Sequence, residues 1–356
     1  MTSLIQRVAS DQIIDQAFSW LCKARENSHY NHDVWHLRFH WQKSRGHLKQ
    51  QLLAGDYQFE PCRAINVKGE SMGLWCARDA LVLKALALVL TKHLAPGLSQ
   101  HCYHLPTRGG TKNCVRHVKQ SVEQYQFVCR SDVDSYYASI NHRVLLKQLS
   151  ERIYDTHIIT LIKRMLARLD DVNGELFTVS VGIGKGNPLS PLLGALYLYP
   201  MDKALGEYCQ KRQLKYFRFM DDWVVLCKTR YQLRDVVRLM NHSLTKVKQH
   251  KHPYKTYIGR IKSGGFDFLG YRIVPDKKEK VTLAWKTIAN HIGKLKQLYE
   301  QGATKTRIAE YVKRWLQWVR SGIAIDLNIV IQMVVSSQLS STLPMSDYWA
   351  MSGIEG

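Results

Sequence analysis

The spacing of hydrophobic and polar positions predicts helices towards both ends of the chain. Residues 10–55 carry apolar side chains at intervals of three and four, and within them Trp35–Trp41 is expected to form a helix that packs its aromatic rings inward. Ala80–His93 is a longer and more apolar helix. Trp285–Tyr299 and Lys305–Val319 repeat the amphipathic pattern.

Strand-like and helical segments alternate in the middle of the chain. Phe127–Ile140 is predicted to be a strand that breaks into a helix, and Tyr216–Lys228 has two apolar runs around a pair of acids, as in a β-hairpin. Helices are expected over Val144–Leu169 and Gln232–Val247, and strand, turn and strand over Tyr254–Val274. The other segments are a turn-rich loop at Pro106–Asn113, a Gly/Pro loop at Phe177–Pro191 and a helix from Leu192 to about Gln213. This order predicts an α+β fold with an antiparallel sheet.

Length and composition indicate a protein with a substantial core. The 356 residues are 45% hydrophobic, which excludes global disorder and allows two or three domains. The longest apolar run, Ala80–Leu90, is interrupted by Lys84 and is shorter than the roughly 20 residues of a membrane span. The first residues lack the apolar region of a secretory signal. We therefore expect a cytoplasmic protein without a membrane partner.

The charge indicates a polyanionic partner. Lys and Arg number 51 against 29 Asp and Glu, so the formal net charge is +22. Such basic proteins bind phosphates by releasing counterions, and nucleic acid is the expected partner, although a basic protein without that role is the alternative. The eight cysteines form no CxxC pair and are expected to stay reduced.

Two groups of acids are the main candidates for chemistry. Asp221 and Asp222 lie in the sequence FMDDW, where a tight turn between strands would place both carboxylates at the edge of a sheet. Asp132 and Asp134 follow another apolar run. Carboxylates from two strands can hold two Mg²⁺ ions for phosphoryl displacement, and burial beside each other would raise their pKa values. An ordinary polar Asp-Asp turn is the alternative reading.

These motifs resemble the bacterial reverse transcriptases of the retron and group II intron-like assemblage. DVDSYYASI resembles the family's first catalytic block, and FMDDW its Asp-Asp box, with Phe219 in place of Tyr. The other matching blocks follow in the family's order: GKGNPLSPLLGALYL at Gly184–Leu198, HPYKT at His252–Thr256 and FDFLGY at Phe266–Tyr271.

The resemblance implies a right-hand polymerase of fingers, palm and thumb. The N-terminal helices and fingers would occupy residues 1–125, and the palm residues 126–275, with part of the fingers at about 145–185. Residues 276–356 would form a helical thumb and a C-terminal tail.

The resemblance also implies roles for single residues. Asp132, Asp221 and Asp222 would bind two Mg²⁺ ions, for which Mn²⁺ can substitute, and Asp134 would be a flanking acid. Tyr137 would be the steric gate that rejects a 2′-hydroxyl, with core packing as the alternative. Lys255 would protonate the pyrophosphate or, in the alternative, be one more surface lysine that faces phosphate.

Further residues are expected to contact nucleotide or nucleic acid. The second block has Lys185 where the family has Gln, followed by the matching Gly186, and a lysine cannot both donate and accept hydrogen bonds as an amide does. Lys68 and Arg78 are candidates for the triphosphate. The expected nucleic-acid contacts are Arg108 and Gly270 together with the basic face of the thumb, Lys294, Lys296, Lys313 and Arg314.

The expected function is RNA-directed DNA synthesis. The partners would be an RNA template, the DNA product and dNTPs, together with a structured non-coding RNA or an accessory protein, in a system such as anti-phage defence or a retroelement. Template-independent or primer-free DNA synthesis, and a catalytically idle RNA-binding relic, are the alternatives.

Overall fold

The computed structural model describes residues 2–67, 70–262, 264–274 and 281–323, together with positions 325, 330, 332 and 334. The chain divides into two compact units, each made of separate segments. The first unit comprises Met1–Pro106, Val133–Gly206 and Leu239–Pro253, and the second comprises Thr107–Asp132, Glu207–Arg238 and Tyr254–Gly356. The division into fingers, palm and thumb at the boundaries given above stays a prediction.

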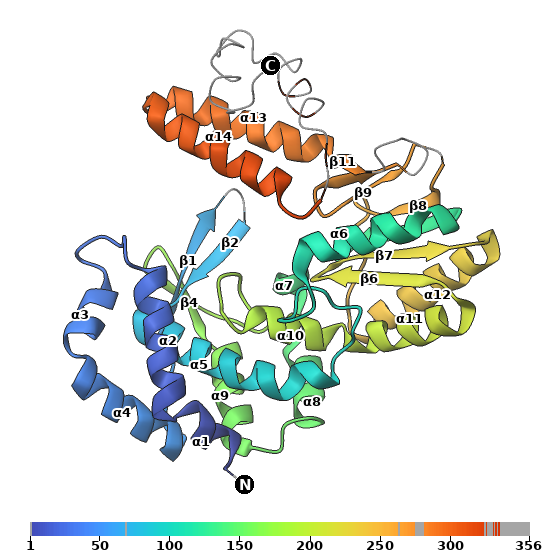
Figure 1. Ribbon diagram of the computed structural model, residues 1–356. Coiled ribbons are helices and arrows are strands. Elements are labelled where there is room, and N and C mark those ends of the chain that lie inside the picture. The colour runs from blue at the N-terminus through green and yellow to red at the C-terminus, as the bar shows by residue number, and fades with distance from the viewer. Residues whose placement is uncertain are drawn as a thin grey trace. The chain divides into compact units, whose positions relative to one another are not determined.

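The first unit is built around a buried helix (Figure 1). Its helices are α1 (Leu4–Val8), α2 (Asp11–Ala24), α3 (Asp33–Phe39), α4 (Trp41–Ala54), α5 (Ala77–Leu94), α7 (Tyr136–Ser139), α8 (His142–Ser150), α9 (Thr156–Leu166) and α10 (Ser190–Tyr197). Helices α1, α2 and α3 pack against α5, which buries apolar side chains around its whole circumference. This agrees with the apolar helix predicted there.

Helix α5 and the short 3₁₀ turn after it meet the length and composition of a membrane span over Ala77–Gly97, and no other described helix does. Just over half of its most apolar stretch is buried inside the unit. The buried carboxylate of Asp79 accepts hydrogen bonds from the Tyr57 hydroxyl at 2.5 Å and from the Glu60 backbone amide at 2.9 Å. These contacts fit the core helix of a globular unit, because a core helix passes the same test of length and composition.

The aromatic segment Trp35–Trp41 differs from its prediction. Helix α3 ends at Phe39 and buries Val34 and Leu37, whereas the Phe39 ring is 85% exposed. Aliphatic side chains at i and i+3 define the inner face of this helix, so the aromatics do not form its core.

The sheet of the first unit contains two hairpins that the sequence analysis missed. It has the order β2-β1-β4-β5, with parallel pairing of β1 and β4. Its strands are β1 (Cys62–Val67), β2 (Glu70–Leu74), β4 (Leu169–Val172) and β5 (Glu175–Thr178). The predicted helix Val144–Leu169 is instead α8 and α9, and Asn173-Gly174 then turns the chain with positive φ at both residues. Asn-Gly is a strong hairpin signal.

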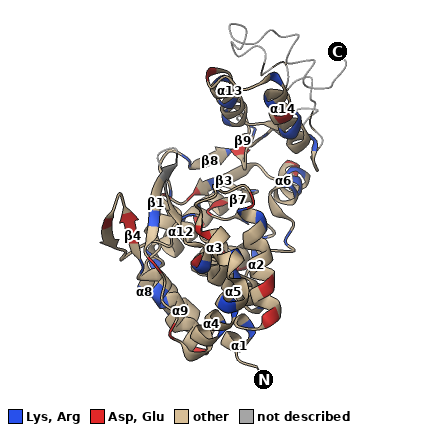
Figure 2. Cartoon of the chain, turned by 90° about the vertical axis from the view of Figure 1, so that its left-hand side faces the viewer, with Lys and Arg blue, Asp and Glu red and all other residues tan. Residues whose placement is uncertain are grey.

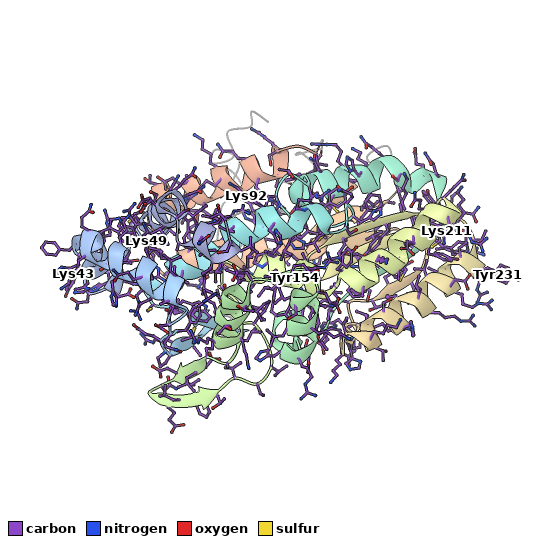
Figure 3. The ribbon with its side chains drawn as sticks, turned by 90° about the horizontal axis from the view of Figure 1, so that it is seen from below. Lys43, Lys49, Lys92, Tyr154, Lys211 and Tyr231 are labelled. Atoms are coloured by element: carbon purple, nitrogen blue, oxygen red, sulfur yellow. The ribbon has the colours of Figure 1, made fainter. Side chains whose placement is uncertain are left out.

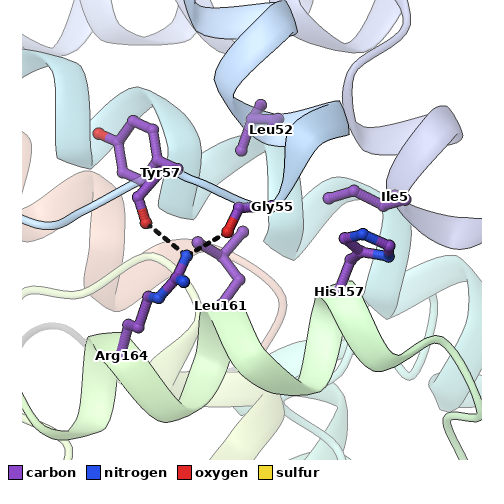
Figure 4. Close-up of a pocket in the computed structure, with 7 residues that line it drawn as sticks. All are labelled: Ile5, Leu52, Gly55, Tyr57, His157, Leu161 and Arg164. Atoms are coloured by element: carbon purple, nitrogen blue, oxygen red, sulfur yellow. Dashed lines mark hydrogen bonds between the residues drawn. The ribbon is translucent and has the colours of Figure 1, made fainter.

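An arginine fastens the segment before β1 to helix α9. Arg164 donates one hydrogen bond to the carbonyl of Gly55 and another, of 3.1 Å, to that of Tyr57 (Figure 4). Gly55 ends α4 in the left-handed conformation, φ +76°, and a Cβ there would lie 2.8 Å from the His157 ring. A glycine is therefore required at this turn.

The second unit contains the four-stranded antiparallel sheet that was predicted for the palm. Its strand order is β6-β7-β3-β8. The strands are β3 (Phe127–Asp132), β6 (Lys215–Phe219), β7 (Asp222–Cys227) and β8 (Tyr257–Arg260). Helices α11 (Tyr199–Arg212) and α12 (Arg230–Lys246) belong partly to each unit, and their second-unit portions lie along one side of the sheet (Figures 1 and 3). Helix α6 (Gly110–Ser121) starts inside the predicted loop Pro106–Asn113, after Gly109 in the left-handed region, and packs against β6.

The last part of the second unit is a small sheet and a pair of helices. Strands β9 (Phe266–Phe268), β10 (Tyr271–Ile273) and β11 (Val281–Leu283) precede α13 (Trp285–Glu300) and α14 (Lys305–Arg320). The apolar stripes of both helices are buried, as predicted, and His291 of α13 stacks on Trp315 of α14 with ring centres 3.8 Å apart. Lys and Arg positions are distributed along both helices (Figure 2).

Candidate active site

A two-residue turn places the paired acids at the edge of the sheet. Phe219 of β6 pairs with Asp222 of β7, so Met220 and Asp221 form the turn. Met220 has φ +54°, a left-handed conformation that is strained for a bulky residue. The buried Arg218 side chain donates a 2.5 Å hydrogen bond to the Met220 carbonyl and so holds this conformation.

The third acid comes from the neighbouring strand. Asp132 is the last residue of β3 and lies directly opposite Asp222 in the antiparallel ladder. Burial, together with the charge of Asp132, raises the pKa of Asp221 to about 7. Burial also raises the pKa of Asp222 to about 6, although the nearby Arg130 guanidinium opposes this shift. The sequence thus brings together three carboxylates that disfavour one another's charge.

Two cations offset this negative charge. Lys255 donates a 2.7 Å hydrogen bond from Nζ to Asp132 Oδ2, and this bond raises the pKa of the lysine. Arg130 Nε lies 3.4 Å from Asp222 Oδ1, and Arg130 Nη1 donates a 2.5 Å hydrogen bond to the backbone carbonyl of Lys255. Arg130 therefore links the segment that carries the lysine to the strand that carries Asp222.

The donor set suits a divalent cation. Asp222 Oδ1 is buried and accepts no well-formed hydrogen bond, and Arg130 Nε, 3.4 Å away, is the cation that faces it. Carboxylate oxygens are the ligands that Mg²⁺ prefers. As they are placed here, no three His, Cys, Asp or Glu side chains of the described ranges are arranged so that they could hold a metal ion, so the acids would have to rearrange to bind one. Since Lys255 occupies Asp132 Oδ2, a cation that used this oxygen would displace the lysine.

A cleft of about 310 Å³ opens beside these residues within the second unit. It is lined by Arg130, Tyr254, Lys255, Thr256, Tyr257, Gly265, Phe266, Asp267 and Arg272. Arg272 pairs with Asp267 at 2.9 Å, so part of the positive charge in the cleft is already compensated.

The raised pKa values predict how metal-free stability depends on pH. The Asp221 carboxyl has a pKa of about 7 in the folded chain and an ordinary value of 3.8. It therefore binds a proton more tightly in the folded chain than in the unfolded one. Its stabilising contribution is complete below about pH 4 and is lost as the pH rises through about 7. We expect the parental protein in EDTA to lose on the order of 2–4 kcal/mol between these values relative to Asp221→Asn. Urea unfolding of both proteins at several pH values measures this difference, and Mg²⁺ should restore the loss near pH 7.5. A parental-minus-variant difference that does not change with pH would contradict the burial of Asp221.

The candidate steric gate belongs to the first unit. Tyr136 is buried, and its hydroxyl donates a 2.5 Å hydrogen bond to the carbonyl of Gly194 in α10. Tyr137 is only partly buried, and its ring would lie 3.2 Å from a Cβ on Gly194. Tyr136 therefore has a structural role, and part of the Tyr137 ring remains accessible.

The loop that carries Lys185 and Gly186 adds to the β1–β2 hairpin. The Gly73 amide donates a 3.0 Å hydrogen bond to the Lys185 carbonyl, and Met72 forms a parallel bridge with Lys185. A Cβ on Gly186 would lie 3.0 Å from the Gly73 carbonyl oxygen. The family-like glycine is thus needed because two backbones approach closely.

The remaining residues predicted to contact nucleotide or nucleic acid lie in different local environments. Arg78 lies 3.3 Å from Glu60 and over the Tyr57 ring, and Lys68 lies outside the described residues. Arg108 is partly exposed beside Thr107 and Gly109, which both have positive φ. Gly270 forms the β9–β10 turn with Leu269 and accepts a hydrogen bond from Thr287. The thumb residues Lys294, Lys296, Lys313 and Arg314 lie on α13 and α14.

Sequence reasoning missed Arg130 and Arg218. Arg130 precedes Asp132 by two positions, and alternate residues of a strand share a face, so this spacing was a usable signal. Arg218 was harder to find because it acts through the backbone of a turn.

Comparison with known proteins relates this chain to one family. The family model described as reverse transcriptase (RNA-dependent DNA polymerase) matches residues 74–273, which is more than half of the chain. Protein YkfC of Escherichia coli is 26% identical over 271 residues, covering 64% of this chain and 70% of YkfC. The group II intron-encoded protein LtrA of Lactococcus lactis is 22% identical over 160 residues, covering 43% of this chain and 27% of LtrA.

A solved structure, titled partial Cas6-RT-Cas1–Cas2 complex, matches with a TM-score of 0.41 and 21% identity. The match covers 69% of this chain and 42% of that one. The chain thus spans less than half of the solved chain and about a quarter of LtrA.

The match to this family model shows the class of protein, a nucleotidyltransferase of the polymerase class, and the α+β fold carries three acids at adjacent strand ends. The chain belongs to the reverse transcriptase family, the RNA-directed DNA polymerases, and is similar to the bacterial group II intron-like members.

Proposed function

We propose that this protein is an active reverse transcriptase that adds dNTPs to a DNA end by two-metal phosphoryl transfer. The convergence of Asp132, Asp221 and Asp222 from adjacent strand ends carries this proposal. An RNA-binding relic has no use for three clustered carboxylates, two of which, Asp221 and Asp222, have a raised pKa, so the geometry favours catalysis.

The three carboxylates would hold two Mg²⁺ ions, or Mn²⁺ in their place. Bound there, the ions would supply charge stabilisation for the attacking 3′-hydroxyl and the leaving pyrophosphate. Lys255 would leave Asp132 and donate a proton to the pyrophosphate from Nζ, and Arg130 would keep the lysine backbone in place. The Tyr137 ring would exclude nucleotides with a 2′-hydroxyl.

Primer extension tests the proposal directly. A DNA primer annealed to an RNA template should be extended with dNTPs and Mg²⁺, and EDTA should abolish extension. Reactions that lack template or primer separate this activity from the template-independent and primer-free alternatives. These alternatives are retained because Lys185 replaces the Gln of the family. If none of these reactions incorporates nucleotides with Mg²⁺ or Mn²⁺, the protein is a catalytically idle RNA-binding relic.

The biological setting is part of the proposal. We place the enzyme in the cytoplasm, with a structured non-coding RNA or an accessory protein as partner and anti-phage defence as its role. The formal charge of +22 supports a large RNA partner. Sequencing the nucleic acids that co-purify with the protein would show whether one RNA predominates, and random cellular RNA would count against a dedicated partner.

The basic helices α13 and α14 should hold the backbone of the template and primer. Replacing Lys294, Lys296, Lys313 and Arg314 by Glu is expected to weaken duplex binding alike for every sequence, because phosphate contacts carry no base information. The slope of log K against log salt should flatten by roughly 0.7–0.9 for each lost contact. Processivity should fall before single-nucleotide addition does. A folded variant that keeps the parental salt slope would show that this face does not hold nucleic acid.

A further inference from the structure

A second groove lies in the second unit, between helix α12 and the edge strand β8. Its volume is about 540 Å³, and it is lined by Arg230, Tyr231, Leu233, Arg234, Val237, Arg238 and Ile258. Seven residues line it and none is acidic. The predicted polymerase activity gives this groove no role.

The groove lies on the face of the sheet opposite to the cleft beside the acids. Tyr257 lines that cleft, whereas Ile258, the next residue of β8, lines this groove. Successive side chains of a strand point to opposite faces. The groove is therefore on the helix-covered side of the sheet and is separate from the candidate catalytic cleft.

The floor of the groove is apolar. Ile258 is 40% exposed although it belongs to the sheet, and Val237 and Leu233 of α12 lie beside it. The branched aliphatic side chains of the floor do not provide the flat surface on which nucleic-acid bases stack, and the one aromatic ring of the lining, Tyr231, lies outside this floor under Arg234. They do fit the apolar side chains of a polypeptide.

Arginines form the rim of the groove. Arg230, Arg234 and Arg238 are four residues apart on α12, so they follow one side of the helix, and all three are exposed. Arg234 also lies over the ring of Tyr231, which is 73% exposed and projects from the ribbon in Figure 3. Planar guanidinium groups match carboxylates in paired hydrogen bonds.

The sheet has an edge at this point. Strand β8 pairs with β3 on one side, and among the described residues no further strand pairs with its other side. Such an edge can accept an extended segment through backbone hydrogen bonds, while neighbouring pockets select its side chains. An apolar floor, a basic rim and an unpaired strand edge are thus found together, and the Tyr257 hydroxyl, which donates a 2.9 Å hydrogen bond to the Arg260 carbonyl, would have to release it to an added strand.

We infer that this groove binds an acidic, partly apolar peptide segment of a partner protein, in extended conformation along β8. Its carboxylates would pair with Arg230, Arg234 and Arg238, and its alternate apolar side chains would cover Ile258 and Val237. The inference does not depend on polymerase activity, since it concerns the other face of the sheet.

A peptide-display selection on the full chain tests this. A library of random twelve-residue peptides is selected on the parental protein and counter-selected on the Arg230→Glu/Arg234→Glu/Arg238→Glu variant. Recovered sequences should alternate Asp or Glu with Val, Ile, Leu or Phe. A fluorescein-labelled recovered peptide should bind the triple variant at least about tenfold more weakly than the parental protein.

The matched control reverses three exposed cations elsewhere in the same unit, as Lys211→Glu/Arg212→Glu/Lys215→Glu. It makes the same change in net charge and should keep the parental affinity for the peptide. If the triple arginine variant melts early, the single variants Arg234→Glu and Ile258→Ala replace it. Primer extension should be unchanged in the arginine variants, so a failure of the polymerase proposal would be seen separately.

Two further measurements decide whether the peptide binds by strand addition and whether the partner is a peptide or an RNA. The peptide should slow amide hydrogen exchange over Tyr257–Arg260, and unchanged exchange there would overturn strand addition. The inference also fails if no recovered peptide is acidic, or if the arginine and control variants bind alike. A labelled RNA hairpin that loses affinity only in the arginine variant and displaces the peptide would identify the groove as an RNA surface and overturn the inference.

Discussion

Asp221→Asn and Asp132→Asn are each expected to reduce nucleotide incorporation by at least about 10³-fold, equivalent to about 4 kcal/mol of transition-state stabilisation. Each change removes a negative charge from a group of three carboxylates that converge from adjacent strand ends. An amide is a poor substitute because two bound metal ions need the full negative charge of their carboxylate ligands. Single-turnover primer extension at saturating dNTP measures the loss.

Asp134→Asn is the matched control. Asp134 lies two positions after Asp132 but is exposed, so the variant should retain nearly parental rates. Folding and RNA binding should survive in all three variants. Asp221→Asn should even raise metal-free stability near pH 7, because it removes a charge that burial disfavours. If the Asp132→Asn/Asp221→Asn double variant polymerises at the parental rate, these residues do not bind the catalytic metals.

Local sequence patterns predicted the catalytic hairpin because its determinants are close together in the chain. Two β-prone runs and a short acidic turn define β6 and β7 almost to the residue. The buried stripes of α13 and α14 likewise follow from helical spacing alone. The missed β4–β5 hairpin had its signal in Asn173-Gly174, but the sequence analysis assigned no element to residues 170–176.

Other features depend on contacts between distant segments, and no local pattern contains them. The pairing of Lys255 with Asp132 joins residues 123 positions apart, and it shows that a cation already occupies one predicted metal-ligand oxygen. The bond from Arg130 to the Lys255 carbonyl spans 125 positions. The sequence identified the acids, but it did not indicate which positive groups stabilise them without metal.

Tyr137→Ala is expected to raise the use of ribonucleotides relative to deoxynucleotides by roughly 10²-fold, a change of nearly 3 kcal/mol in discrimination. The ring is partly exposed and packs against the small Gly194, so its removal opens space without creating a large cavity in the core. Parallel kcat/KM values for dATP and ATP on one template give the ratio.

Two variants separate a steric gate from core packing. Tyr137→Phe keeps the ring and should keep the parental sugar preference, because exclusion of a 2′-hydroxyl depends on ring volume. Tyr136→Phe removes the hydroxyl that bonds to the Gly194 carbonyl and should reduce stability by about 1 kcal/mol without changing sugar choice. If Tyr137→Ala lowers the melting temperature and leaves the dATP-to-ATP ratio unchanged, Tyr137 is a packing residue, and the site selects its sugar through another side chain.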